Sequence, residues 1–193
     1  RLDYTKRPSG KKRHVVLVST IPVLHLRLRQ EAVAPADLVG LRDDLLDQWE
    51  APPHRGERAR LISDLVDLSR QSRASVTILA GDIHVGSWVR LTAHNSGQPD
   101  VTINQVVSSG IVHPPMSKLM IWGLKAISVT APEELTNIET SFLLINNDQF
   151  LLFRNYASIA FDPPGAGDRS RLWVEWKSEG PAVSSMVVVE PQA

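Results

Sequence analysis

An aspartate and a histidine stand two positions apart directly after an apolar run of the chain. The run Ser75–Ala80 reads SVTILA and continues into Gly81, Asp82, Ile83 and His84. Residues i and i+2 of an extended backbone project to the same side, so the carboxylate and the imidazole can converge on one metal ion. A glycine lets the backbone turn sharply as it leaves the sheet. The residue types and their spacing therefore predict Asp82 and His84 as metal ligands.

A structural interpretation of the same residues stays open. An aspartate after a glycine is common in turns, where its carboxylate accepts hydrogen bonds from nearby N–H groups. A neighbouring histidine can simply pack and form a hydrogen bond. Under this alternative, the chain is a non-catalytic α/β module that serves packing or partner binding.

Two apolar runs and one amphipathic helix are the elements that must position this motif. His14–Thr20 and Ser75–Ala80 have the continuous apolar character of buried strands. Between them, Glu57–Arg73 carries apolar residues at the i, i+3 and i+4 spacing of a helix that covers a sheet. Strand, helix and strand in this order favour an α/β fold with a parallel or mixed sheet. Ligands of such sheets bind at the C-terminal ends of the strands, where Asp82 and His84 stand.

The rest of the chain is read mainly as antiparallel strands. Ser87–Ala93 and Val101–Val107 are strand-like and are separated by a turn-rich segment. Residues 143–145 and 150–156 flank the sequence Asn146–Asp148, which predicts a hairpin. Further helices are expected over residues 38–49 and 116–128.

Composition and charge narrow the classes of protein that remain. The 193 residues include 21 basic and 21 acidic side chains, so the basic excess of a nucleic-acid-binding protein is missing. The chain has no cysteine, which excludes disulfides, thiolate metal sites and cysteine nucleophiles. No apolar run reaches the roughly 18 residues that a membrane span needs. The chain begins at Arg1 and not at methionine, so we expect an excised piece of a longer protein whose localisation is open.

Several segments in a fixed order together resemble the PhoD-like alkaline phosphatases, which belong to the calcineurin-like metallophosphoesterase superfamily. In chain order these segments are Asp44–Trp49 (DLLDQW), His54–Arg58 (HRGER), the helix and strand that follow, Gly81–Val85 (GDIHV) and Ser108–Pro115 (SSGIVHPP). The resemblance covers residues 14 to 128. Its specificity lies in the ordered combination, since no single motif would suffice.

The resemblance implies a fold and a division of the chain. The fold would be the C-terminal half of a four-layer α/β/β/α metallophosphoesterase sandwich, a mixed sheet followed by antiparallel strands. Residues 1–193 would form a single domain that is itself part of a larger one. Within it, residues 14–128 would be the α/β part that holds the metal motif, and residues 138–190 would form the antiparallel strands.

The resemblance also implies an activity, the metal-dependent hydrolysis of a phosphate mono- or diester. Asp82 and His84 match the late metal-ligand motif of the family, and the ions would be divalent or trivalent, namely iron, calcium, manganese or zinc. Arg58 and His113 are the candidate catalytic residues. The resemblance does not by itself assign a role to Arg58, which either touches the site, where it could offset phosphate charge, or pairs with a neighbouring carboxylate. His113, which precedes two prolines, is a candidate contributor to the site.

The chain departs from the family pattern in the ligands that it lacks. An early aspartate, a Gly-Asp segment and an Asn-His or Asn-Glu pair belong to the first half of the family's domain, and none precedes Asp82 here. Two ligands cannot hold a dinuclear centre. We therefore expect the isolated chain to bind metal weakly and to be nearly inactive, with the missing ligands encoded before Arg1. The expected partner is a phosphate ester substrate, with no nucleic acid, no membrane, and self-association through an exposed sheet edge.

Overall fold

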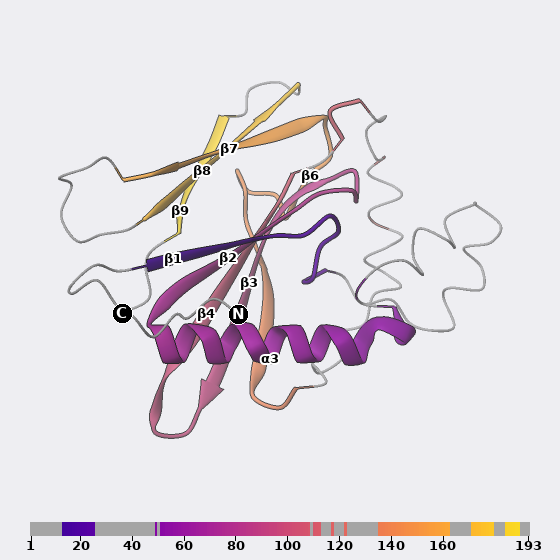
Figure 1. Ribbon diagram of the computed structural model, residues 1–193. Coiled ribbons are helices and arrows are strands. Elements are labelled where there is room, and N and C mark those ends of the chain that lie inside the picture. The colour runs from indigo at the N-terminus through magenta and orange to yellow at the C-terminus, as the bar shows by residue number, and fades with distance from the viewer. Residues whose placement is uncertain are drawn as a thin grey trace.

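The structure of the chain is a computed structural model, which describes residues 13–25, 49, 51–108, 110–112, 117, 122, 135–162, 171–179 and 184–189 (Figure 1). In chain order its elements are β1 (Arg13–Val18), the 3-10 helix η2 (Pro52–His54), α3 (Arg55–Ser72), β2 (Ala74–Ala80), β3 (Gly86–Asn95), β4 (Gln98–Val107), β5 (Ile138–Leu143), β6 (Phe150–Leu151), β7 (Asn155–Phe161), β8 (Leu172–Ser178) and β9 (Ser184–Val189).

The larger sheet is mixed, as the sequence predicts. Its strands follow the order β1-β2-β4-β3-β5, and β6 also pairs with β3. β1 runs parallel to β2, and β2 runs parallel to β4. β3 is antiparallel to both β4 and β5. The α/β class is therefore confirmed, and the strand that carries the candidate metal motif lies inside the sheet with a parallel neighbour on each side.

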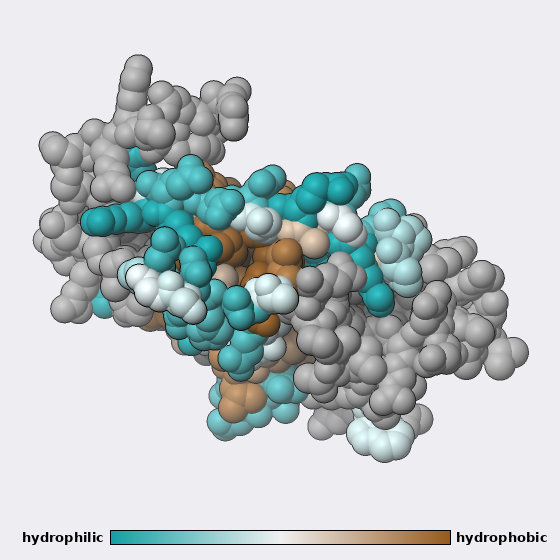
Figure 2. Space-filling model, turned by 90° about the horizontal axis from the view of Figure 1, so that it is seen from below, coloured by the Kyte–Doolittle hydropathy of each residue, from teal (hydrophilic) through white to brown (hydrophobic). Residues whose placement is uncertain are grey.

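Helix α3 covers one face of the larger sheet (Figure 1). Its buried residues Ile62, Leu65 and Val66 recur at the i, i+3 and i+4 spacing, which places them on one side of the helix. They pack in one apolar cluster with sheet residues such as Val76 and Leu91. Seen from below, hydrophobic residues gather in the middle of the described surface, with hydrophilic residues around them (Figure 2).

A second, three-stranded antiparallel sheet of order β7-β8-β9 packs on the opposite face. Leu172, Val174 and Trp176 of β8 form an apolar cluster with Val106 of β4. The Trp176 side chain is buried, and its indole N–H donates a hydrogen bond of 2.9 Å to the Val107 carbonyl. The described residues thus form three layers, α/β/β, and a fourth helical layer stays a prediction.

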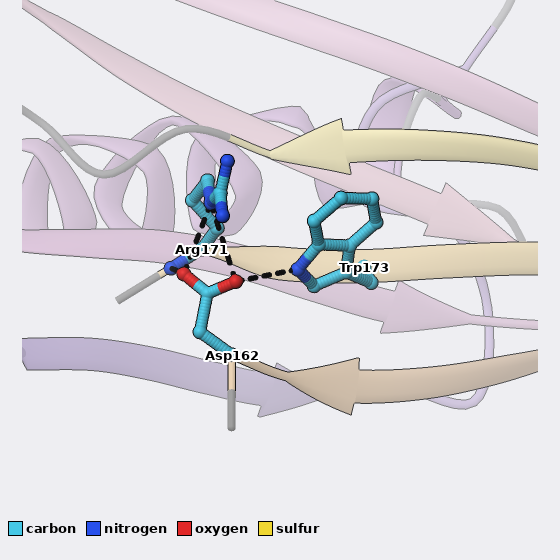
Figure 3. A network of polar contacts seen from close by, with 3 residues as sticks. All are labelled: Asp162, Arg171 and Trp173. Carbon is cyan, nitrogen blue, oxygen red and sulfur yellow. Dashed lines mark hydrogen bonds and ion pairs between the residues drawn. The ribbon is translucent and has the colours of Figure 1, made fainter. Parts of the chain in front are cut away.

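A partly buried carboxylate links β7 to β8 at one end of the small sheet (Figure 3). Asp162 accepts hydrogen bonds from the Nε of Arg171 at 3.0 Å and from the indole N–H of Trp173 at 2.7 Å. The guanidinium carbon of Arg171 also lies 5.1 Å from the Trp173 ring centroid. The hydrogen bonds from Arg171 and then from Trp173 lower the pKa of Asp162 to about 2.

The predicted hairpin of residues 143–145 and 150–156 is wrong in its strands. Ile145 and Asp148 do form an antiparallel bridge around a tight turn, in which Asn146 and Asn147 have left-handed φ angles. The flanking strands β5 and β6, however, both pair with β3 and lie one after the other along it. The turn sequence therefore predicts the local chain reversal correctly. The strands on either side of the turn do not pair with each other, because both pair with the same edge of β3.

The predicted helices at 38–49 and 116–128 lie outside the described residues, apart from single positions, and the predicted division of the domain stays a prediction. In the described parts of the chain, no helix has both the length and the apolar character that a membrane crossing requires.

Candidate metal-binding site at the strand ends

The C-terminal ends of β1, β2 and β4 meet at one edge of the larger sheet. Beyond the ends of these strands, main-chain bonds continue, from Ser19 N–H to the Leu79 carbonyl at 2.9 Å and from Ser108 N–H to the Ala80 carbonyl at 3.0 Å. Gly81 N–H reaches the Thr20 carbonyl at 3.3 Å. A Cβ atom on Gly81 would lie 3.3 Å from the Ser108 carbonyl oxygen, so a side chain there would crowd the edge.

Asp82 occupies the centre of a three-residue turn at this edge. The Ile83 N–H donates to the Gly81 carbonyl at 3.0 Å, and Asp82 between them has a φ of 69°. A positive φ combined with an i to i+2 hydrogen bond is typical of the rare, strained form of the γ-turn. Strained backbone persists only where the surrounding structure imposes it, and it clusters at functional sites. The carboxylate is exposed to solvent, as a ligand for an incoming ion must be.

His84 also has a left-handed backbone, with a φ of 56°, and it is half-buried. The loop after β4 passes over it, because a Cβ atom on Gly110 would lie 3.7 Å from the His84 Cα. The expectation that Asp82 and His84 project together from an extended strand is therefore wrong. β2 ends at Ala80, and two left-handed residues in the next four positions replace strand alternation by a tight loop.

The donor set formed by these two residues suits a metal ion in type but not in number. A carboxylate oxygen and an imidazole nitrogen bind zinc, manganese and iron well. A structural or catalytic ion needs four to six ligands, and two metals need more. Among the described residues, no group of three or more His, Cys, Asp or Glu side chains could hold an ion. Asp82 and His84 therefore fit part of a metal centre and leave several positions to other ligands.

Arg58 of helix α3 contacts the loop that follows β1. It is 1% exposed, and its Nε donates a hydrogen bond of 2.7 Å to the Val23 carbonyl. The buried side-chain oxygen of Gln105, Oε1, accepts hydrogen bonds from the N–H groups of Val23 and Leu24 at 2.8 and 2.9 Å. Arg58 and Gln105 thus fix the loop whose Thr20 contacts Gly81. This gives Arg58 a structural role, and its contact with a phosphate group stays a prediction.

An aromatic cluster lies beneath the turn. Ile83, between the two proposed ligands, packs with Phe150 and Phe142. The imidazole of His25 meets the edges of these two rings at centroid distances of 6.2 and 6.5 Å. Burial in this cluster lowers the pKa of His25 to about 4. The loop after β1 therefore carries a neutral imidazole into the apolar layer under the candidate site.

His113, the second predicted catalytic residue, lies outside the described residues. The structure also reveals three supporting residues that were not predicted as such, namely Gln105, Ser108 and Asn155. Ser108 begins the segment Ser108–Pro115, which carries part of the family resemblance. For Gln105 the sequence held no distinct signal, because β4 contains several other polar residues, among them Asn104 next to it. For Asn155 no signal existed, since its contacts join segments far apart in the chain.

Comparison with known proteins identifies the family of the chain. A family model described as PhoD related phosphatase matches residues 13–133, more than half of the chain. The chain belongs to this family. An uncharacterized protein of Saccharomyces cerevisiae, YGR266W, is 44% identical over 55 residues, which are 28% of this chain and 8% of that protein. The chain thus corresponds to a small part of that relative's length. No solved structure matches the chain.

Proposed function

We propose that the protein is a metal-dependent phosphoesterase, which hydrolyses phosphate mono- or diesters, and that Asp82 and His84 supply two of the metal ligands. The observation that carries the proposal is their placement in a strained loop at the C-terminal ends of parallel strands. Membership of a phosphatase family supports the choice of reaction.

The residues near the candidate site would take different roles in the proposed hydrolysis. The exposed carboxylate of Asp82 and the half-buried imidazole of His84 would hold the ion. A bound ion would polarise the phosphoryl oxygens and lower the pKa of a bound water. Arg58 and Gln105 keep the neighbouring loop in place. The described residues supply no further group of ligands, so the remaining ones would come from other parts of this chain or from further polypeptide.

The test compares two backbone-compatible variants with the parent. Aspartate, asparagine and histidine tolerate left-handed φ angles better than other non-glycine residues. Asp82→Asn and His84→Asn therefore remove a ligand without the strain that alanine would add. We expect each to lower the metal-stimulated hydrolysis of p-nitrophenyl phosphate or bis-p-nitrophenyl phosphate by about 100-fold or more. The melting temperature should stay within a few degrees of the parent value.

The matched control makes the reverse exchange at another turn. Asn147→Asp changes an amide to a carboxylate at a φ of 71°, close to that of Asp82, and should leave hydrolysis unchanged. Assays should use both the 193-residue chain and the complete polypeptide of its reading frame, with manganese, zinc, iron and calcium each added in turn. Parental activity in Asp82→Asn and His84→Asn would disprove the ligand assignment. An absence of hydrolysis in both polypeptides would favour the non-catalytic module.

A further inference from the structure

A buried asparagine of the small sheet reaches the edge of the larger sheet beside the candidate site. Asn155, the first residue of β7, is 3% exposed. Its Oδ1 accepts a hydrogen bond of 3.0 Å from the hydroxyl of Ser108, which follows β4. Its own amide group donates to the Phe153 carbonyl at 2.9 Å, which fixes the side chain in this orientation.

The two residues hold both ends of the loop that carries Asp82 and His84. At the entry, Ser108 N–H bonds the carbonyl of Ala80, the last residue of β2. At the exit, Gly86 begins β3 so close to the asparagine that a Cβ atom there would lie 3.0 Å from Asn155 Oδ1. The loop of residues 81–85 therefore starts and ends against the Ser108–Asn155 pair.

We infer that Ser108 and Asn155 are positioning residues for the metal loop, an inference that rests on the proposed function. Residues that support metal ligands commonly change metal affinity by 10- to 100-fold when they are mutated. Asn155 belongs to the small sheet, so through its contacts with Ser108 and Gly86 this sheet would help to position the metal loop.

The key comparison uses serine variants that differ in one hydroxyl group. Ser108→Ala removes the donor to Asn155, whereas Ser108→Thr keeps a hydroxyl at the same place. Ser87→Ala is the matched control, because Ser87 is buried in the adjoining β3 and its hydroxyl has no hydrogen-bond partner among the described residues. Asn155→Ala removes the acceptor from the other side.

Manganese titration of the complete polypeptide gives the first readout. Ser108→Ala and Asn155→Ala should weaken Mn²⁺ binding by about 10-fold or more, Ser108→Thr should recover most of the affinity, and Ser87→Ala should match the parent. A purely structural role would lower the melting temperature without this change in affinity, so equal Mn²⁺ affinity in the parent, Ser108→Ala and Asn155→Ala would overturn the inference.

Hydrogen–deuterium exchange of residues 81–86 gives a second readout that needs no metal. Faster exchange there in Ser108→Ala than in Ser87→Ala is the expected result, and identical exchange in the two variants overturns the inference. If the parent itself bound no metal, the proposed function would fail while the exchange experiment would still decide whether Ser108 and Asn155 position the loop.

Discussion

At the residue scale, His25 illustrates how packing sets the charge of an ionisable group. Its imidazole lies at the edges of Phe142 and Phe150. Its Nδ1 is buried without a hydrogen-bond partner among the described residues. Such surroundings disfavour the imidazolium form, and so the pKa falls from 6.5 to about 4. The ring is therefore neutral at physiological pH, in the form that can still accept a hydrogen bond.

This depressed pKa makes the stability of the protein depend on pH. The unfolded chain takes up a proton on His25 near pH 6.5, whereas the folded chain does so only near pH 4. The contribution of the neutral His25 to the free energy of unfolding is fully present above pH 6.5. It is lost as the pH falls towards 4, which lowers the free energy of unfolding by on the order of 2 to 3 kcal/mol. Urea unfolding of the parent and of His25→Phe between pH 7.5 and 4 measures this effect.

The phenylalanine variant should show a flatter dependence over this window, because it has no proton to bind. His94→Gln is the control, since His94 is an exposed imidazole beside Asp100. Parallel pH curves for the parent and His25→Phe would show that His25 is not responsible.

At the scale of the elements, the connection between β7 and β8 depends on the bonds that Asp162 accepts. Arg171 and Trp173 both donate to the carboxylate, so the ionised form is favoured only while the two strands are paired. These bonds hold one end of the β7–β8 pair, in addition to the main-chain bonds between the strands and the hydrogen bond from Ser158 to Glu175.

Acid should open this end of the small sheet. The pKa of Asp162 is lowered from 3.8 to about 2, so its contribution is present above pH 4 and is lost as the pH falls from 4 through 2. Asp162→Asn should lower the melting temperature at pH 7 and should weaken the further loss below pH 4. Thermal unfolding monitored by circular dichroism between pH 7 and 2 checks both effects.

Asp148→Asn is the control for the loss of a carboxylate in a turn, because main-chain bonds to Ile145 hold that turn. If Asp148→Asn and Asp162→Asn changed the acid response equally, the hydrogen bonds to Arg171 and Trp173 would not be its cause.

The elements also show which parts of the fold can be predicted from sequence. β1, α3 and β2 were predicted to within two residues, because continuous apolar runs and a helical period leave a clear local pattern. The position of Gly81 and Asp82 after β2 followed from the same pattern. The partner of β6 was not predictable, since it depends on pairing with the distant strand β3. The left-handed turn at Asp82 was not predicted either, because the apolar pattern of β2 does not indicate the φ angles of the residues that follow it.

At the scale of the whole molecule, β1 forms one side of the larger sheet. Among the described strands its only neighbour is β2. Val18, near the end of β1, is 76% exposed, and Val16 is also exposed. An apolar edge strand presents unpaired N–H and C=O groups to other chains. The expected self-association through a sheet edge therefore has a specific candidate in β1.

Val18→Lys tests this expectation, because a charged side chain on an edge strand opposes pairing with a second sheet. We expect the parent chain to show a mass above that of the monomer by light scattering at high concentration, and Val18→Lys to shift it towards 21.4 kDa. Val112→Lys adds the same charge at an exposed position outside the named strands. A parent chain that is monomeric at every concentration would contradict the expectation.

The hydrogen bond from Trp176 to the Val107 carbonyl joins the two sheets through a single N–H group. That proton is shielded from water while the sheets stay together and can exchange with solvent only when they separate. The exchange rate of this proton, followed by nuclear magnetic resonance, therefore measures how often the two sheets separate. Val107 immediately precedes Ser108, so the same exchange rate would also report how often the candidate metal loop loses its support.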